Sequence, residues 1–353
     1  MIPLGDLPGG SFHSFPAALS GNGLVAVGTS SSQPGFGTGE AFSWSTLTGI
    51  VGLGTLDGVS IGQGVSPNGR FIVGNTYGTS AGNLGVLWAP DGSVHHIPDI
   101  PGGNNVSGTA DVSDTGVVVG YSQYATNSIG PLSQAIRWTV DGGLQPLGFL
   151  SDTDTNSVAY AISADGSVIA GRSNSGNWLW TEDKGMTFAI GNEFLAQNMT
   201  NDGRFLVGVT DEIVNGQYVG VPTIWSAGTG RIDLPIGDVP PSWVSSVVRD
   251  ASLDAEVLLG MRYALQGGGV PYIWFDQGST GMVLTDYLLL NGLDFNASGY
   301  RINDVAGISD DGTRFLLETF NPDGSREAVL VIVPAPATAS IFTLGLIATR
   351  RKR

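Results

Sequence analysis

The chain has 353 residues, 54 of them glycine, no cysteine, and a formal net charge of −16 at pH 7. The absence of cysteine excludes a disulfide framework, a thiolate metal site and a cysteine nucleophile. The acidic charge repels phosphate groups, so we expect no nucleic-acid partner.

The first feature in chain order is a Leu-Gly-x-Leu segment at residues 4–7, ahead of seven copies of a repeated motif. Each copy places a Ser or Thr, two variable residues and usually a Gly between two apolar runs. We call the Ser or Thr the anchor, and each copy with its flanking strands a unit. The anchors of units 1 to 7 are Ser20, Ser66, Ser113, Ser163, Thr200, Ser252 and Ser309. Their mean spacing of about 48 residues is typical of propeller blades.

Within a unit the pattern predicts four strands. The anchor and the Gly suit a tight turn with a positive φ at its end, which joins the first two strands as a hairpin. The third strand closes on Trp in units 1 to 6, and we interpret these Trp residues as core between neighbouring units. The fourth strand is expected at Leu-Gly-x-Leu segments such as residues 53–56 and 147–150.

These features predict an all-β protein, a seven-bladed β-propeller over residues 1–334. Because unit 7 has no Leu-Gly-x-Leu segment after Val333, we expect residues near 3–7 to complete the last blade and close the ring. A β-solenoid with two rungs per repeat is the alternative fold. In unit 6, Ala255 replaces the Gly, so either the turn changes type or an alanine adopts a left-handed conformation.

Few residues of the units suggest ligand binding. Asp152, Asp154 and Asn156 alternate as the first oxygen ligands of a calcium loop do, although the later Gly and Glu of such a loop are missing; a hydrophilic turn is the alternative. Trp178 and Trp243 lie outside the strand-closing position and would stack on sugar rings if exposed, whereas loop anchoring is the alternative. The pair at residues 95–96 is His-His, whose side chains point to opposite faces of a strand, which disfavours joint metal binding.

Residues 335–353 form a separate C-terminal tail. It combines a Pro-marked motif, an apolar stretch of about 13 residues expected to be a short helix, and a basic end that favours the cytoplasmic side of a membrane. Spanning a bilayer takes roughly 20 apolar residues. The motif and the basic end comprise Val333, Pro334, Ala335, Pro336, Arg350, Arg351, Lys352 and Arg353.

The tail resembles the PEP-CTERM class of bacterial sorting signals, in a variant with Val-Pro-Ala-Pro in place of Val-Pro-Glu-Pro. That resemblance implies export, recognition by an exosortase-type membrane protease and removal of the segment after the motif. Residues 4–334 resemble the HAF-repeat family of bacterial extracellular proteins, which implies a surface or secreted location and no known reaction. Met1-Ile-Pro-Leu has neither the basic nor the apolar region of an export signal, so we expect that the start is assigned too far downstream or that the sequence is trimmed; intracellular residence is the alternative.

No catalytic residues are predicted, because no Ser lies in a nucleophile elbow and the sequence does not show which carboxylates converge. We therefore expect an exported, monomeric cell-surface or matrix protein with a non-catalytic role, which binds polysaccharide or surface proteins and meets the membrane only through its tail. The alternative is a secreted polysaccharide hydrolase or lyase. Carboxylates and His95 at a central pocket would favour that enzyme, and an apolar or sealed channel would count against it.

Overall fold

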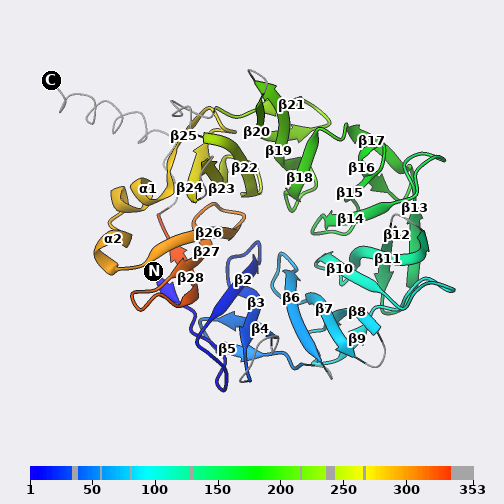
Figure 1. Ribbon diagram of the computed structural model, residues 1–353, viewed down its shortest axis with the longest axis horizontal. Coiled ribbons are helices and arrows are strands. Elements are labelled where there is room, and N and C mark those ends of the chain that lie inside the picture. Colours follow the sequence, from blue (N-terminus) through cyan, green and yellow to red (C-terminus); the bar gives the residue numbers. More distant parts are fainter. Residues whose placement is uncertain are drawn as a thin grey trace.

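The computed structural model describes residues 1–33, 39–55, 58–79, 82–127, 130–214, 217–235, 243–264 and 268–334. Within them the regular secondary structure is almost entirely β-strand, and the sheets are arranged as a ring around a common centre (Figure 1). No helix in these ranges has the length and apolarity needed to cross a membrane. The predicted tail helix and the sorting motif from Ala335 onward lie outside the described residues.

Units 1 to 4 each form one four-stranded antiparallel sheet, with the strands in chain order. Unit 1 contains β2 (Ser14–Leu19), β3 (Val25–Ser31), β4 (Gly39–Ser45) and β5 (Gly49–Gly52). Unit 2 contains β6 (Val59–Val65), β7 (Ile72–Thr79), β8 (Gly82–Trp88) and β9 (Val94–His96). Unit 3 contains β10 (Ser107–Val112), β11 (Val118–Asn127), β12 (Gly130–Thr139) and β13 (Gly143–Gly148). Unit 4 contains β14 (Ser157–Ile162), β15 (Ile169–Ser173), β16 (Gly176–Thr181) and β17 (Gly185–Ile190).

Units 5 and 6 share one eight-stranded sheet, because Gly220 and Ser245 form a single parallel pair between them. Unit 5 contains β18 (Phe194–Met199), β19 (Phe205–Val214), β20 (Gln217–Ser226) and β21 (Gly230–Asp233). Unit 6 contains β22 (Trp243–Ala251), β23 (Val257–Ala264), β24 (Gly269–Phe275) and β25 (Thr280–Val283), followed by α1 (Leu284–Leu290) and α2 (Phe295–Ser298). Unit 7 contains β26 (Arg301–Ile308), β27 (Arg314–Phe320) and β28 (Arg326–Ile332).

The anchor side chain holds the turn after the first strand in every unit. In unit 4, Ser163 Oγ donates to Asp165 Oδ1 at 2.6 Å and accepts the Val168 N–H at 3.0 Å. Equivalent bonds recur at the other anchors. Ala255 shares the turn, with a φ of 57° and its N–H 2.9 Å from the Ser252 carbonyl oxygen. The left-handed alternative for Ala255 is therefore confirmed.

In unit 1 the Leu-Gly-x-Leu segment follows the fourth strand instead of forming it, whereas in unit 3 the fourth strand, β13, runs into the segment and ends at Gly148, so this part of the prediction was only partly correct. In unit 1, β5 ends at Gly52, and Leu53 keeps one backbone bond to the Ala41 carbonyl at 2.8 Å. Gly54 then has a φ of 92°, which extended strands do not adopt. The leucine packs into the core between units 1 and 2.

The N-terminal segment pairs with unit 7. β1 (Ile2–Pro3) lies antiparallel to β28, so the strand is shorter than the expected residues 3–7 and ends before Gly5, whose φ is 75°. Leu4 donates its N–H to the Ala328 carbonyl at 2.9 Å, and the Ala328 N–H bonds to Ser14 Oγ at 3.0 Å. The corresponding contacts at 2.8 and 2.9 Å join unit 1 to unit 2, through Leu53, Ala41 and Ser60.

Buried apolar side chains form seven clusters in the described residues, one between each pair of neighbouring units. Trp88, for example, packs against Val27 and Ala41 of unit 1, and its Nε1 donates to the Leu53 carbonyl at 3.0 Å. The strand-closing Trp residues of units 1 to 4 and 6 are at most 6% exposed. Their interpretation as core between units is confirmed.

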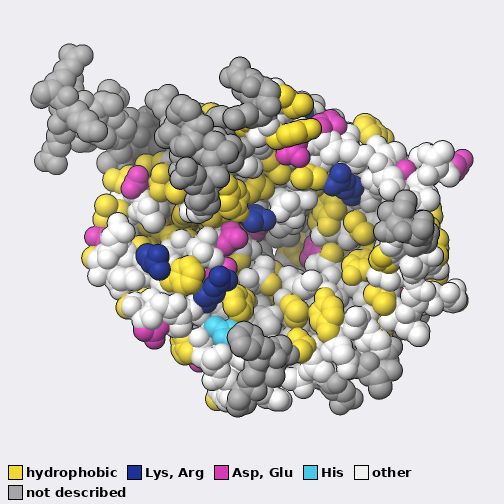
Figure 2. Space-filling model, viewed as in Figure 1, with side chains coloured by type: hydrophobic (Ala, Val, Ile, Leu, Met, Phe, Trp, Pro, Cys, Tyr) yellow, Lys and Arg dark blue, Asp and Glu magenta, His cyan; other side chains and the backbone are white. Residues whose placement is uncertain are grey.

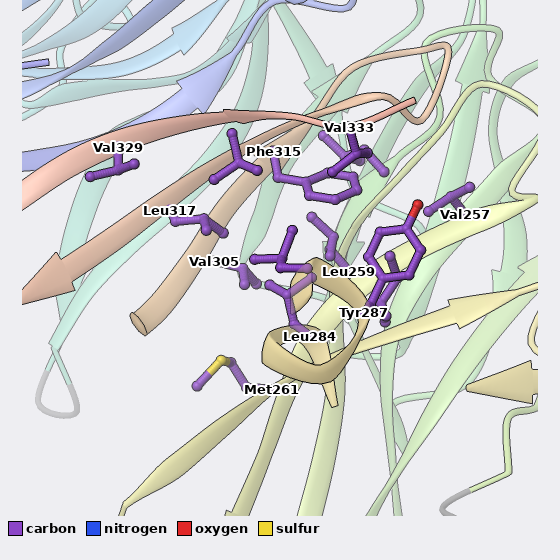
Figure 3. Close-up of a cluster of buried hydrophobic side chains, with 14 of the residues drawn as sticks. Val257, Leu259, Met261, Leu284, Tyr287, Val305, Phe315, Leu317, Val329 and Val333 are labelled. Carbon is purple, nitrogen blue, oxygen red and sulfur yellow. The ribbon is translucent and has the colours of Figure 1, made fainter. Parts of the chain in front are cut away.

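Unit 7 lacks the Trp, and a helix fills its place between units 6 and 7. The Tyr287 ring of α1 lies 5.2 Å from the Phe275 ring of unit 6 and 6.2 Å from the Phe315 ring of unit 7. Figure 3 shows Leu284 and Tyr287 of α1 beside Phe315 and Leu317. The helix thus supplies the apolar volume that an aromatic residue supplies elsewhere in the ring.

Candidate functional site

One register position in each unit places a side chain at the centre of the ring. The first strand of every unit carries a β-bulge three residues before the anchor. The bulge residues are Ala17, Gln63, Ala110, Tyr160, Gln197, Arg249 and Ala306, and all seven line a cavity of about 390 Å³. We call this the central cavity; its volume is within the range of small-ligand sites.

The lining of the central cavity is asymmetric. Units 1, 3 and 7 contribute alanine at the bulge and unit 2 contributes Gln63, whereas the adjacent units 4 to 6 contribute Tyr160, Gln197 and Arg249. The Tyr160 hydroxyl is buried without a hydrogen-bond partner, and burial raises its pKa. Figure 2 shows a hollow near the centre of one face, with basic and acidic side chains beside it. Three of the four large bulge side chains therefore lie on one wall.

Arg249 is the one cationic residue among the described residues that line the cavity. Its Nη1 donates to Gln197 Oε1 and its Nη2 to the Tyr263 hydroxyl, each at 3.0 Å. Asp304 Oδ2 lies 3.6 Å from the same Nη2, while Nε is buried without a partner. Three neighbours thus fix the guanidinium, and its Nε–H is left without a partner.

Two carboxylates of unit 7 face each other beside Arg249. The β26–β27 register pairs Asp304 with Glu318, and both residues line the cavity. Directly opposed residues point to the same face of a sheet. Glu318 Oε1 accepts from Arg326 Nη1 at 2.9 Å, so each acid has its own arginine. A carboxylate pair beside a polar pocket is the arrangement used for acid–base cleavage of glycosidic bonds.

Two further aspartates sit one residue after the bulge and link neighbouring units. Asp111 accepts the Ile162 N–H of unit 4 at 3.0 Å, and Asp250 accepts the Ile308 N–H of unit 7 at 2.9 Å. Burial raises the pKa of Asp111 to about 6 and that of Asp250 to about 7, although hydrogen bonds to both carboxylates oppose the shift. Both line the central cavity.

At the other end of the first strands, the anchor turns contact one another. Asn201, one residue after its anchor in unit 5, donates through Nδ2 to Asp310 Oδ1 of unit 7 at 2.7 Å. Backbone bonds of 2.7 to 3.0 Å join further turns, at Asn22–Pro67, Asp114–Ala164, Ala164–Asn201, Leu253–Asp310 and Asp310–Gly21. A second hollow of about 660 Å³, the turn-end hollow, is lined by Ala164, Asn201, Asp310 and neighbouring turn residues.

The structure does not gather the ligand-binding residues expected from sequence. Trp178 is fully buried in the core between units 3 and 4, so its ring cannot stack on a sugar. Trp243 begins β22, and its side chain is outside the described residues. His95 lies on β9, away from the cavity lining, with Nε2 2.8 Å from Ser93 Oγ.

Two of the three predicted calcium ligands accept hydrogen bonds from other parts of the fold. Asp154 Oδ2 accepts from Ser175 Oγ at 2.6 Å, and Asn156 Oδ1 accepts the Ser133 N–H at 2.8 Å. Across the described residues, no three His, Cys, Asp or Glu side chains are grouped so that they could hold a metal ion. Calcium binding at Asp152, Asp154 and Asn156 stays a prediction.

Comparisons with protein-family models and with curated protein sequences gave no match. Among solved structures, an oligogalacturonate lyase in complex with manganese aligns with a TM-score of 0.57 at 12% identity, over 94% of this chain and 90% of that one. A puromycin hydrolase aligns with a TM-score of 0.55 at 13% identity, over 89% of this chain and 51% of that one. TolB from Acinetobacter baumannii aligns with a TM-score of 0.46 at 12% identity, over 88% of this chain and 64% of that one.

The chain thus spans about half of the puromycin hydrolase and less than two thirds of that TolB. These similarities concern the fold, and they identify an all-β protein that resembles β-propeller proteins. The expectation of a non-catalytic protein is corrected, because the matches with TM-scores above 0.5 include a lyase and a hydrolase. The polar lining of the central cavity agrees with that correction.

Proposed function

We propose that the chain is a carbohydrate-cleaving enzyme, a hydrolase of neutral polysaccharide, with its site on the Arg249 wall of the central cavity. The observation that carries the proposal is the cross-strand pair of Asp304 and Glu318, two carboxylates in a cavity of small-ligand size. One carboxyl protonates the glycosidic oxygen, and the other activates water or attacks the anomeric carbon. Arg249 and Gln197 offer hydrogen bonds to sugar hydroxyls.

Charge favours hydrolysis of a neutral polymer over elimination from an acidic one. Residues 1–349 carry 11 basic and 31 acidic residues, and such a field repels polyanions. The cavity wall itself has Arg249 against four carboxyl groups. A lyase acting on uronates, as the name of the aligned oligogalacturonate lyase implies for that protein, is therefore the less favoured reaction.

The expected result is release of reducing ends from at least one neutral polysaccharide in a panel of glucans, mannans and galactans. Asp304→Asn and Glu318→Gln should each lower the rate about 10²- to 10⁴-fold, because each removes one acid–base group. Asp141→Asn and Glu182→Gln, at exposed turns, are the matched controls and should retain full activity. Release of unsaturated sugars would indicate a lyase, and equal rates in all four variants would contradict the assignment.

We propose further that the ring is a seven-bladed β-propeller, with units 5 and 6 as separate blades and β1 as the outer strand of the last blade. The support is that the contacts of Leu4, Ala328 and Ser14 match those between units 1 and 2. The seven inter-unit cores of the described residues agree with this count.

We also propose that the protein is exported as a HAF-repeat protein and sorted through its PEP-CTERM-like tail. The support is the sequence alone, in the Val-Pro-Ala-Pro motif and the four basic residues at the end. Removal of residues 333–353 from the native gene should shift the protein from the envelope fraction to the medium or periplasm, measured by immunoblotting of cell fractions. Identical fractionation of both forms would show that the tail does not sort the protein.

A further inference from the structure

The central cavity has a floor, and Asn201 is part of it. Asn201 lines both the central cavity and the turn-end hollow, so it stands at the boundary between the two. Its hydrogen bond to Asp310 connects unit 5 to unit 7 past the intervening unit 6. A Cβ added at Gly21 of unit 1 would lie 2.5 Å from Asp310 Oδ2 and 2.6 Å from Asn201 Nδ2. Turns of three units therefore meet where an open channel would continue.

The position of each polar group along its strand gives its depth above this floor. Asn201 comes one residue after its anchor, Arg249 three residues before its anchor, and Asp304 five residues before. Because a strand rises about 3.3 Å per residue, Asp304 and its partner Glu318 stand well above the floor, with Arg249 between. A substrate that reaches the carboxylate pair has space below it that ends at Asn201.

Building on the proposed function, we infer that the central cavity is a blind pocket with one mouth, and that the enzyme cleaves short products from the ends of neutral polysaccharide chains. An internal stretch of a polymer would need a second exit or an open cleft to pass the carboxylate pair. A chain end needs neither, because it enters and leaves by the same mouth. Cleavage at Asp304 and Glu318 then releases only the segment held between the pair and the floor.

The first test compares products over time with the wild-type full chain. End cleavage accumulates short sugars from the outset while the polymer peak in size-exclusion chromatography keeps its position. Internal cleavage shifts that peak before short sugars appear, and this result would overturn the blind pocket while leaving the proposed function intact. Release of no sugar from any polymer would contradict the proposed function. Whether the central cavity has a single mouth is then decided by the binding test alone.

The binding test uses linear hexaoses of glucose, mannose and galactose, each with free ends or with a bulky aromatic group on both ends. We expect at least one hexaose with free ends to bind. Capping that hexaose should raise its Kd, measured by calorimetry, at least about tenfold, because the capped end cannot enter the pocket. Equal binding of free and capped sugars would overturn the inference. So would binding of no hexaose at all.

A matched pair of variants distinguishes a blind pocket from an open channel. Ala17→Phe narrows the central cavity, whereas Ala164→Phe places the same ring in the turn-end hollow, beyond the floor. We expect Ala17→Phe to weaken hexaose binding at least about tenfold and Ala164→Phe to leave it unchanged, with folding of both checked by circular dichroism. Comparable losses in both folded variants would mean that the sugar passes through, and loss in neither would place it outside the cavity. If either variant does not fold, the capped hexaoses decide.

Discussion

At the scale of single residues, the distance from the anchor decides what a side chain does. Residues three before the anchor face the central cavity, as Arg249 does, because a bulge turns them out of the strand alternation. One residue later, Asp250 also lines the cavity, but its carboxylate accepts a backbone N–H of the next unit. The anchor itself closes the turn, as Ser163 does. Polar residues only a few positions apart thus line the cavity, join two units or close a turn, depending on their distance from the anchor.

Ala255→Gly should stabilise the protein slightly. The left-handed conformation costs an alanine about 1–2 kcal/mol, while loss of its buried methyl group costs about 0.8 kcal/mol. We therefore expect a gain of up to about 1 kcal/mol in the free energy of unfolding, measured with denaturant. Gly166→Ala, at the same turn position with a φ of 78°, should lose about 1–2 kcal/mol. A less stable Ala255→Gly variant would show that methyl packing outweighs the strain.

Asp250 should make the protein less stable as the pH rises. Its pKa in the fold, about 7, lies above the ordinary value of 3.8, so the folded state holds a proton that the unfolded state has lost between these values. Stability present at low pH is therefore lost as the pH rises toward 7.

Asp250→Asn removes this pH dependence. The difference in free energy of unfolding between variant and wild type should shift by about 3 kcal/mol in favour of the variant from pH 5 to pH 8. At both pH values the variant also loses hydrogen bonds that the carboxylate accepts. Denaturant unfolding at the two pH values measures the difference. Asp254→Asn, at an anchor turn of the same unit, is a control for general charge effects. A constant difference between Asp250→Asn and wild type would show that this carboxyl does not titrate abnormally.

At the scale of elements, the short N-terminal strand has more effect than its length suggests. β1 has two residues, yet Leu4 and Leu7 after it are 4% and 5% exposed, in the core between units 7 and 1. Leu7 also donates its N–H to Ser30 Oγ of unit 1 at 2.9 Å. The segment therefore covers the outer edge of β28 and fills a core at the same time.

Deletion of residues 1–8 should lower the melting temperature sharply. Loss of the two buried leucines alone lowers the free energy of unfolding by about 1.5–3 kcal/mol for each leucine, and the edge of β28 becomes unpaired. Differential scanning calorimetry measures the change. Leu24→Ala, at a leucine that is 50% exposed, should leave the melting temperature nearly constant. An unchanged melt after the deletion would contradict closure of the ring by β1.

At the scale of the whole molecule, the ring brings together residues that are far apart in sequence. Gln197, Arg249 and Asp304 come from three units, and the Asn201–Asp310 bond spans 109 positions. A site of this kind forms only when every unit is in place. Loss of unit packing should therefore remove the site together with the fold.

The sequence by itself determined the local structure. The anchors, glycines and strand-closing Trp residues predicted the β class, the turns and the core between units, because these depend on backbone conformation and apolar volume within one repeat. The position three residues before the anchor gave no comparable signal, because the residues on either side of it vary among the units as much as it does.

Only the tertiary structure decided the candidate site. Convergence of Arg249 with Asp304 and Glu318, burial of Trp178 and the floor at Asn201 all follow from the way the units surround one centre. In unit 1 the fourth strand also ended before its Leu-Gly-x-Leu segment, because Gly54 turns the chain away. Contacts between units depend on the curvature of the whole ring, which no single repeat specifies.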